Sequence, residues 1–486
     1  MPYLKNLILG GHYHADFYSS SSSMASSAKI ETLHILSLDL TKRPFASRGF
    51  AQFICKMSSL KSLTLGEGDE IFLHDDFYSS SSSMASSAKI ETLNILSLDL
   101  TKRPSASRDL AQFICKMPRL KSLTLGEGDE VFLHDDFYSS SSSMASSAKV
   151  ETLNIRNNED LSERPSASRD LAQFICNMLH LKDLSLKGHI ILLSLQIETL
   201  TISFVDVSVR PYASRDLAQF ICKVPHLKNL SLGGQYHDDF YSTSSSIASS
   251  AKIKTLNIRY ADVSERPYAS RDLAQFICKM PHLTNLSLDG QHHDDFFSTS
   301  SSMASSAKIE TLEIRSEDLH GRPSASRDLA QFICKMSHLK DLTLGRGSYM
   351  HRVSLHDDFY STSSSMASSA KIETLYFHSW GLSELPCASR DLVQFICKMP
   401  HLKKLSLEGQ YHDDFYSTWS SIASSAKIET LYFHSWGLSE LPCASRDLAQ
   451  FLCKMPHLKE LTLHGQRHDD FYSTSSSMAS SAKVLI

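Results

Sequence analysis

A histidine followed by two aspartates recurs along the chain in the short motif HDDFYS. Copies begin at His74, His134 and His237, and a late copy is His468, Asp469 and Asp470. These residue types could hold a metal ion. Each copy stands where a helix should begin, however, and an aspartate there can accept hydrogen bonds from free backbone N–H groups and favour the helix dipole. We therefore expect the aspartates to cap helices, and we expect no metal site.

Cysteines also recur at one fixed place. Equivalent residues two strands apart would be separated by roughly 10 Å, whereas a disulfide needs Cα atoms within about 7 Å. The sequence contains no CxxC pair, so we expect small buried thiols in a reducing compartment. Two further cysteines, Cys387 and Cys443, occupy a place that is Ser or Tyr in most other copies. The eight cysteines in copies of the FICKM sequence are Cys55, Cys115, Cys176, Cys222, Cys278, Cys334, Cys397 and Cys453.

No arrangement for catalysis stands outside the repeats. There is no G-x-S-x-G turn and no Gly-rich loop that could cradle a phosphate. The serine run from Ser79 to Ser83 could be phosphorylated, but its positions are typical of the exposed side of a weak helix whose Phe77 and Met84 face inward. Every reactive side chain recurs at a structural position. We expect a non-enzymatic scaffold without a cofactor.

The elements that position these side chains come from one repeated unit, of which residues 227–282 are an example. Its first half has apolar residues at the first, fourth and sixth places, Leu227, Leu230 and Leu232, and its second half repeats this spacing from Ile253. The fourth and sixth residues of an extended chain point to one side, and the third and fifth to the other. The spacing therefore predicts a strand with one buried face in each half.

A helix should follow each strand. In ASRDLAQFICKM, apolar residues recur at intervals of three and four, between a proline that suits helix entry and one that suits a stop. The apolar residues are Ala269, Leu273, Phe276, Ile277 and Met280, and the prolines are Pro267 and Pro281. Strand, loop and helix in about 28 residues predict a leucine-rich repeat. We expect an α/β solenoid shaped as a horseshoe, with a parallel sheet on its concave face and helices on its convex face.

The domain organisation follows from this repeat. We expect residues 1–486 to form a single solenoid of about 17 repeats. A shortened coil should lie at 181–202, where the Ser-rich helix is replaced by SLKGHIILLSLQ. Both ends lack a polar cap, and the last strand is a remnant at Val484, so we expect a fragment of a longer protein or a partner at each end.

Net charge and hydropathy limit the classes of partner that we expect. A formal net charge of −4 offers no excess of cations for phosphate contacts, so nucleic acid is not expected. No run of 18 apolar residues exists to span a membrane. The first residues lack the features of a secretory signal, and we expect a cytoplasmic chain.

Differences between the copies indicate a binding surface. The outward strand positions become aromatic and charged toward the C-terminal end, and aromatic anchors are typical of binding hot spots. An alternative is recent duplication, since LYFHSWGLSELPCASRDL occurs twice without change and Trp380 and Trp436 could fill the core. The candidate ligand-binding residues are Tyr376, His378, Tyr432, His434, Glu313, Lys404 and Glu460.

The motifs LKNLSL and IETLNI, with their paired helices, resemble the ribonuclease-inhibitor-like class of leucine-rich repeats. ASRDLAQFICKMPHL is similar to the repeat arrays of NACHT and leucine-rich-repeat receptors, the NOD-like receptors. The resemblance implies an intracellular module for innate sensing that binds a protein or microbial ligand, with a NACHT domain missing from this sequence. The chain departs from the family after its strands, where the usual Asn or Cys is replaced by Leu38, Ala261, Glu317 or Trp380.

Two other functions remain open from the sequence. One is an inhibitor of the ribonuclease-inhibitor type, which would grip a basic enzyme with acidic concave residues. The scattered acidic residues available for this are Asp183, Glu313, Asp341 and Glu460. The other is a purely structural adaptor.

Overall fold

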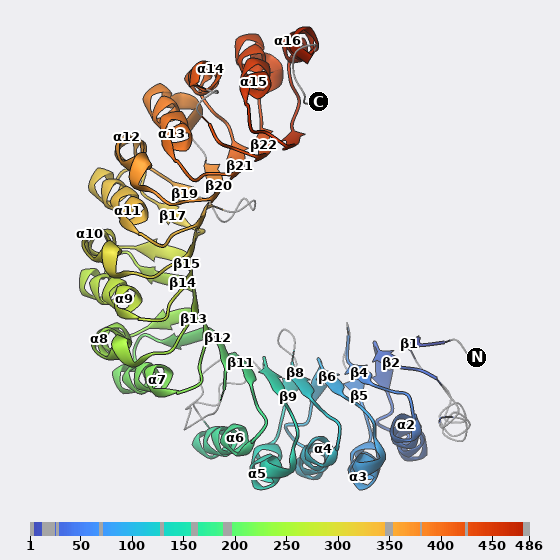
Figure 1. The fold of residues 1–486 in the computed structure, drawn as a ribbon. Helices are drawn as coiled ribbons and strands as arrows, with labels where there is room; N and C mark the ends of the chain where they lie inside the picture. Colours follow the sequence, from blue (N-terminus) through green and yellow to red (C-terminus); the bar gives the residue numbers. More distant parts are fainter. Residues whose placement is uncertain are drawn as a thin grey trace. The chain divides into compact units, whose positions relative to one another are not determined.

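The structure, a computed structural model, divides into two compact units, Met1–Ser231 and Leu232–Ile486. In each unit, parallel strands form a sheet whose one face is covered by helices (Figure 1). We call the other face of the sheet the open face. In the described part of the chain, no helix is both long and apolar enough to cross a membrane. The structure describes residues 4–11, 25, 29–67, 71–126, 131–156, 164–187, 197–345, 353–379, 382–422 and 426–479.

Strands form at the seventeen predicted places. Neighbouring strands pair in parallel with equivalent leucines side by side, as in Leu33 with Leu63 and Leu342 with Leu375. The strands are β1 (Asn6–Leu9), β2 (Thr32–Ile35), β4 (Ser62–Leu65), β6 (Thr92–Ile95), β8 (Ser122–Leu125), β10 (Thr152–Ile155), β11 (Asp183–Lys187), β12 (Thr199–Val207), β13 (Asn229–Tyr236), β14 (Thr255–Val263), β15 (Asn285–His292), β16 (Thr311–Ile314), β18 (Asp341–Leu344), β20 (Thr374–Ser379), β21 (Lys404–Gly409), β22 (Thr430–Ser435) and β23 (Glu460–His464). The predicted α/β fold with a parallel sheet is therefore confirmed.

The facing of these strands also follows the prediction. In β2, Leu33 and Ile35 are buried under the helices, whereas Thr32 and His34 lie on the open face and are half-buried. Burial of two large aliphatic side chains per strand, at about 1.5 to 3 kcal/mol each, attaches the sheet to its helices. Six shorter strands follow some of the main ones: β3 (Leu38–Asp39), β5 (Ile71–Phe72), β7 (Leu98–Asp99), β9 (Val131–Phe132), β17 (Glu317–Asp318) and β19 (Val353–Ser354).

One class of helix begins at proline. In α9, Pro267 is the first helical residue, and the predicted apolar stripe is buried together with Ser270. The Ser270 hydroxyl donates to the Val263 carbonyl at 3.0 Å and accepts from the His293 backbone N–H at 3.0 Å, which ties the helix to a strand end and to the next helix start. Helices of this class are α2 (Pro44–Lys56), α4 (Pro104–Lys116), α6 (Pro165–Asn177), α7 (Pro211–Lys223), α9 (Pro267–Lys279), α11 (Pro323–Lys335), α13 (Pro386–Lys398) and α15 (Pro442–Lys454).

The second class begins at the HDDFYS motif, but the capping residue differs from the prediction. In α3, Nδ1 of His74 accepts the hydrogen bond from the Asp76 backbone N–H at 3.2 Å, so the histidine and not an aspartate is the N-cap. The helices are α3 (Asp75–Met84), α5 (Asp135–Met144), α8 (Asp238–Ile247), α10 (Asp294–Met303), α12 (Asp357–Met366), α14 (Asp413–Ile422) and α16 (Asp469–Ala479). Short 3-10 turns are η2 (Ala85–Ser87), η3 (Ala145–Ser147), η5 (Ala248–Ser250), η6 (Ala304–Ser306), η7 (Ala367–Ser369), η8 (Leu382–Glu384) and η10 (Leu438–Glu440).

The aspartates of the motif instead join neighbouring helices. Asp76 pairs with Arg48 of α2 at 2.7 Å, and Asp75 pairs with Arg103 at the start of α4. Both carboxylates lie in the first turn of α3, where they also favour the helix dipole. Among the described residues, no group of three or more His, Cys, Asp or Glu is placed to hold a metal ion.

The serine runs are only partly exposed. Ser79 and Ser83 of α3 face solvent as predicted, but Ser81 and Ser82 are buried, and Met84 is only half-buried. The small serine side chain lets α3 pack against the neighbouring proline-started helices on both sides. The prediction that the run lies on the exposed face was therefore wrong for two of its five residues, Ser81 and Ser82.

The cysteines are free thiols. Cys387 and Cys443 are exposed, and Cys176 and Cys453 of the FICKM series are half-buried. Burial raises the pKa of the others, for example that of Cys278 to about 12. The predicted buried thiols are confirmed at Cys55, Cys115, Cys222, Cys278, Cys334 and Cys397.

The place just after the strand is filled by different buried side chains. Leu38 and Ala261 are buried there, and Glu317 is 1% exposed with its carboxylate 2.8 Å from Nδ1 of His292. In place of the regular Asn or Cys of the family pattern, these positions therefore make contacts that differ from one repeat to the next. Trp380 and Val484 lie outside the described residues, as do residues 188–196 of the predicted short coil. The strands that flank those residues, β11 and β12, pair directly with each other.

Candidate functional site

Four adjacent strands of the second unit, β20 to β23, carry the aromatic part of the open face. In one row across these strands, Tyr376 pairs with Ser406, Ser406 with Tyr432, and Tyr432 with Thr462. The next row along the strands contains His378, Glu408, His434 and His464 in the same order. Both rows face away from the helices, because these residues occupy odd-numbered places of each half-unit and the buried leucines even ones.

The two tyrosines stand two strands apart, about 10 Å by the usual strand spacing. Ser406 lies between them, and its small side chain leaves both rings half-buried but accessible. The Tyr376 hydroxyl donates to Oε2 of Glu408 at 2.7 Å. The Tyr432 ring lies 5.2 Å from the His464 ring, on its other side. The tyrosines are therefore separated by Ser406 and do not stack on each other.

Glu408 lies at the centre of this group. Its carboxylate is 3.4 Å from Nδ1 of His434 and 3.9 Å from Nδ1 of His378, and its side chain is 15% exposed. The sequence reasoning did not select Glu408 or His464. A signal was present, because their place in the half-unit is glycine in five other copies: Gly10, Gly66, Gly126, Gly233 and Gly345.

A tryptophan completes the group. The Trp436 ring lies 4.6 Å from His434 and 6.2 Å from His378, and Trp436 is half-buried. It therefore packs on the histidines and does not fill the core, which was the alternative expectation. His378 is 3% exposed, so its neighbours in this group cover it almost completely. We call Tyr376, His378, Glu408, Tyr432, His434, Trp436 and His464 the aromatic cluster.

Two other candidate residues lie one row away from the aromatic cluster. Lys404 and Glu460 are exposed on β21 and β23, with Thr430 between them in the register. The Thr430 hydroxyl donates to Oε2 of Glu460 at 3.2 Å. The lysine and glutamate thus border the aromatic cluster on its strand-start side.

The remaining candidate, Glu313, belongs to a separate polar group. Oε1 of Glu313 is 2.9 Å from Nε of Arg315, and Oε2 accepts from the Ser287 hydroxyl at 3.1 Å. The hydrogen bond to Glu313 raises the pKa of Arg315, and the nearby carboxylate of Asp289 adds to this. Glu313 is therefore engaged on the side away from Tyr376, and the structure does not bring it into the aromatic cluster.

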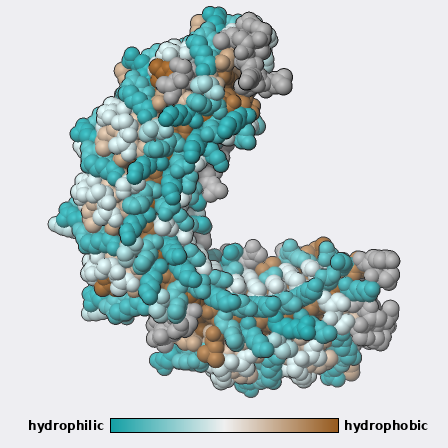
Figure 2. Space-filling view, in the orientation of Figure 1, coloured by the Kyte–Doolittle hydropathy of each residue, from teal (hydrophilic) through white to brown (hydrophobic). Residues whose placement is uncertain are grey.

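Hydrophilic residues cover most of the surface seen in Figure 2, and hydrophobic ones appear in small scattered patches. Several large exposed side chains are single residues on helix starts or turns, such as Tyr212 and Tyr268. The aromatic cluster differs from these because its rings lie side by side on one face of the sheet, around the carboxylate of Glu408.

Comparisons with known proteins add little to this description. No protein-family model and no curated protein matches the chain. One similar solved structure is titled "Crystal structure of TLR13-ssRNA13 complex"; it is 11% identical, with a TM-score of 0.35, over 95% of this chain and 79% of that one. Repeated strands and helices in fixed register define the fold by themselves. The chain is a leucine-rich-repeat solenoid.

Proposed function

We propose that this leucine-rich-repeat chain is a non-enzymatic module that recognises another protein through the aromatic cluster. The observation that carries the proposal is the grouping of Tyr376, Tyr432 and Trp436 around Glu408 on the open face. Tyrosine and tryptophan dominate binding hot spots, because they combine a large apolar surface with a polar group. A half-buried carboxylate among these rings would fix the orientation of a partner's polar or cationic side chain.

The position of the cluster within the repeat supports this function. At the same places of the first unit, the open face carries Thr64, Asn94 and Thr124, which have small polar side chains. The strands therefore tolerate aromatic or polar residues equally well at these places, because the side chains do not enter the core. The rings of the second unit are not required by the fold, and this is expected of residues that contact a partner.

The test compares two double variants of the whole chain. Tyr376→Ala with Tyr432→Ala removes two rings of the cluster, whereas Tyr212→Ala with Tyr268→Ala removes two rings that are 75% and 71% exposed elsewhere. Partners captured from the source cells by cross-linking would be identified, purified and measured by calorimetry. We expect the cluster variant to bind at least about 30-fold more weakly, since hot-spot truncations cost about 2 kcal/mol or more, and the control variant to bind normally.

The control variant should unfold at the temperature of the unmodified chain, because its two side chains are exposed. The cluster variant should unfold only slightly lower, because its two side chains are outside the core but it also loses the hydrogen bond from Tyr376 to Glu408. Undiminished binding by the cluster variant would show that the partner uses another surface. Equal weakening by the control variant would show that the contact is not specific.

We also propose, on the sequence resemblance, that the partner is a protein or microbial ligand and that the array senses it in the cytoplasm as part of a NOD-like receptor. A transcript that encodes a NACHT domain upstream of Met1 is the expected result, and a start codon at Met1 without such a domain would contradict it. Of the four acidic residues that the inhibitor alternative would use, Glu313 is already paired with Arg315.

A further inference from the structure

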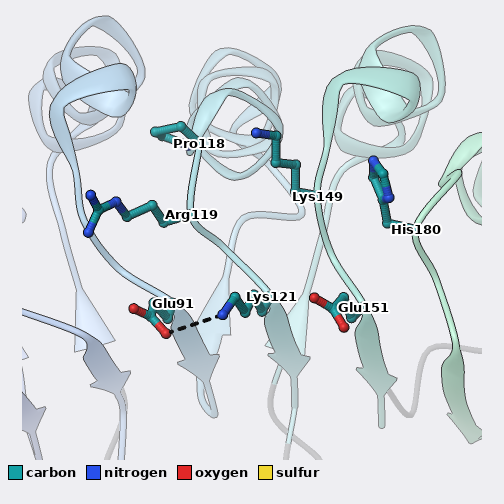
Figure 3. Close-up of a pocket in the computed structure, with 7 residues that line it drawn as sticks. All are labelled: Glu91, Pro118, Arg119, Lys121, Lys149, Glu151 and His180. Carbon is teal, nitrogen blue, oxygen red and sulfur yellow. Dashed lines mark ion pairs between the residues drawn. The ribbon is translucent and has the colours of Figure 1, made fainter.

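The first unit has a depression at the edge of the sheet where β6, β8 and β10 begin (Figure 3). Its volume is about 500 Å³. Six of its seven lining residues have ionisable side chains; the lining consists of Glu91, Pro118, Arg119, Lys121, Lys149, Glu151 and His180. It lies outside the aromatic cluster and in the other unit.

Acidic and basic side chains alternate along the strand starts in the lower part of Figure 3. Lys121 lies 3.7 Å from Glu91, and Lys182 of the next strand lies 2.6 Å from Glu151. The hydrogen bond from Lys182 lowers the pKa of Glu151, so this carboxylate is ionised at neutral pH. Both glutamates are thus already engaged by lysines, and this limits the repulsion that they exert on an incoming anion.

Three further basic side chains, Arg119, Lys149 and His180, form a second row above the first (Figure 3). They come from the loops between a helix end and the following strand, and all are exposed. Within the described ranges, neither Arg119 nor Lys149 makes an ion pair or side-chain hydrogen bond. The depression therefore holds two cations that have no ionic partner among the described residues.

We propose that this depression binds a small, multiply phosphorylated anion, such as an inositol polyphosphate, either free or as the headgroup of a lipid. The guanidinium of Arg119 can hold a phosphate through two parallel hydrogen bonds, and Lys149 can neutralise a neighbouring phosphate. The volume lies within the range of about 300 to 1,000 Å³ that is usual for ligand pockets. The basic side chains among its lining residues suit an anion.

Other copies of the repeat show why the site is local. The place of Arg119 is held by Ser59 in the preceding repeat and by histidine in each later one. The place of Lys149 is held by Lys89 one repeat earlier, just before β6 and thus on the other side of β8 from Lys149. Lys149 lines the depression whereas Lys89 does not. Arg119, where the preceding repeat has serine, therefore distinguishes this depression from the equivalent position of that repeat.

The chain itself supplies matched variants. Arg119→Ser introduces the residue that the preceding repeat carries at this place, so the fold is preserved. Lys149→Ala removes the second cation, and Lys89→Ala removes an equivalent lysine outside the depression. Calorimetric titration of the full chain with inositol hexakisphosphate should give about fivefold weaker binding for Arg119→Ser and for Lys149→Ala, since each cation near an anionic group contributes about 1 kcal/mol. Lys89→Ala should bind as the unmodified chain does.

Vesicles separate the two sources of the phosphates. Sedimentation with phosphatidylcholine vesicles that contain phosphatidylinositol 4,5-bisphosphate should retain the chain if the headgroup of a lipid is bound, and Arg119→Ser and Lys149→Ala should reduce retention. Binding in only one of the two assays, with this pattern of variants, identifies the source and supports the site. The proposal is overturned if the chain binds neither probe, or if Lys89→Ala weakens binding as much as Lys149→Ala, because the attraction would then be diffuse.

Discussion

Alanine should stabilise the chain where it replaces a buried serine of the HDDFYS helices. Ser300 of α10 is 1% exposed, and its hydroxyl has no hydrogen-bond partner among the described residues. Ser302, two residues later in the same helix, is exposed, and its hydroxyl donates to the Thr299 carbonyl at 2.7 Å. Ser300→Ala and Ser302→Ala thus make the same chemical change, once in the core and once at the surface.

The magnitude follows from three terms. A buried hydroxyl without a partner costs about 1 to 3 kcal/mol of desolvation, which alanine recovers. Alanine adds about 0.5 kcal/mol of helix propensity. The small space left by the oxygen opposes these gains by less than about 1 kcal/mol. We therefore expect Ser300→Ala to raise the free energy of unfolding by about 1 to 2 kcal/mol, and Ser302→Ala to change it by no more than about 0.5 kcal/mol.

Urea titration provides the assay, with the fluorescence of Trp419 and Trp436 in the same unit as the reporter. The transition midpoint should rise for Ser300→Ala at an unchanged slope, because the surface exposed on unfolding stays the same. Ser244 and Ser363 are equivalent buried serines in other repeats, and their gains should add to that of Ser300, since the sites share no contacts. A midpoint for Ser300→Ala no higher than that of Ser302→Ala would refute the reasoning.

Two further predictions concern buried titratable groups. With a thiol reagent at pH 8, Cys387 and Cys443 should react fast, whereas the buried cysteines should react only after unfolding. The reason is that burial raises the pKa of a thiol such as Cys278 to about 12. Rapid reaction of six or more thiols in the folded chain would contradict this prediction. Burial also raises the pKa of Tyr241, so above pH 10 the unfolded chain loses this proton while the folded chain keeps it, and stability falls as pH rises. When the pH rises from 8 to 10.5, the free energy of unfolding of Tyr241→Phe, measured by urea titration, should fall by about 0.8 kcal/mol less than that of the unmodified chain. An equal decrease in both chains would count against burial as the cause. Phe297 at the equivalent place shows that phenylalanine fits.

Sequence periodicity was sufficient for the fold because each half-unit repeats its apolar places. The spacing of Leu33 and Ile35 places both against the helices, and Pro267 marks the start of a helix, independently of the rest of the chain. The helix caps were predicted less well. An aspartate is the usual capping residue, and only the backbone geometry shows that His74 accepts the hydrogen bond while Asp75 and Asp76 reach to Arg103 and Arg48.

The candidate site was predicted in part for a similar reason. Tyr376 and Tyr432 could be assigned to the open face by counting places, and the structure puts them there. Counting places also assigns Glu408 to the open face, but its role in the aromatic cluster comes from neighbours on two other strands. The separation of Glu313 from the aromatic cluster depends likewise on Arg315 and Ser287, which lie beside it only after the strands pair.

The sequence by itself determined which residues are strand, helix, core and open face, because these depend on spacing along the chain and on burial of apolar side chains. Tertiary structure alone decided which polar side chains meet. Contacts between repeats join residues about 25 to 35 positions apart, and the rotamers that complete them depend on the neighbouring repeat. This is why Glu408 gathers tyrosine and histidines in one unit, while Arg119 and Lys149 have no ionic partner among the residues that the structure describes in the other.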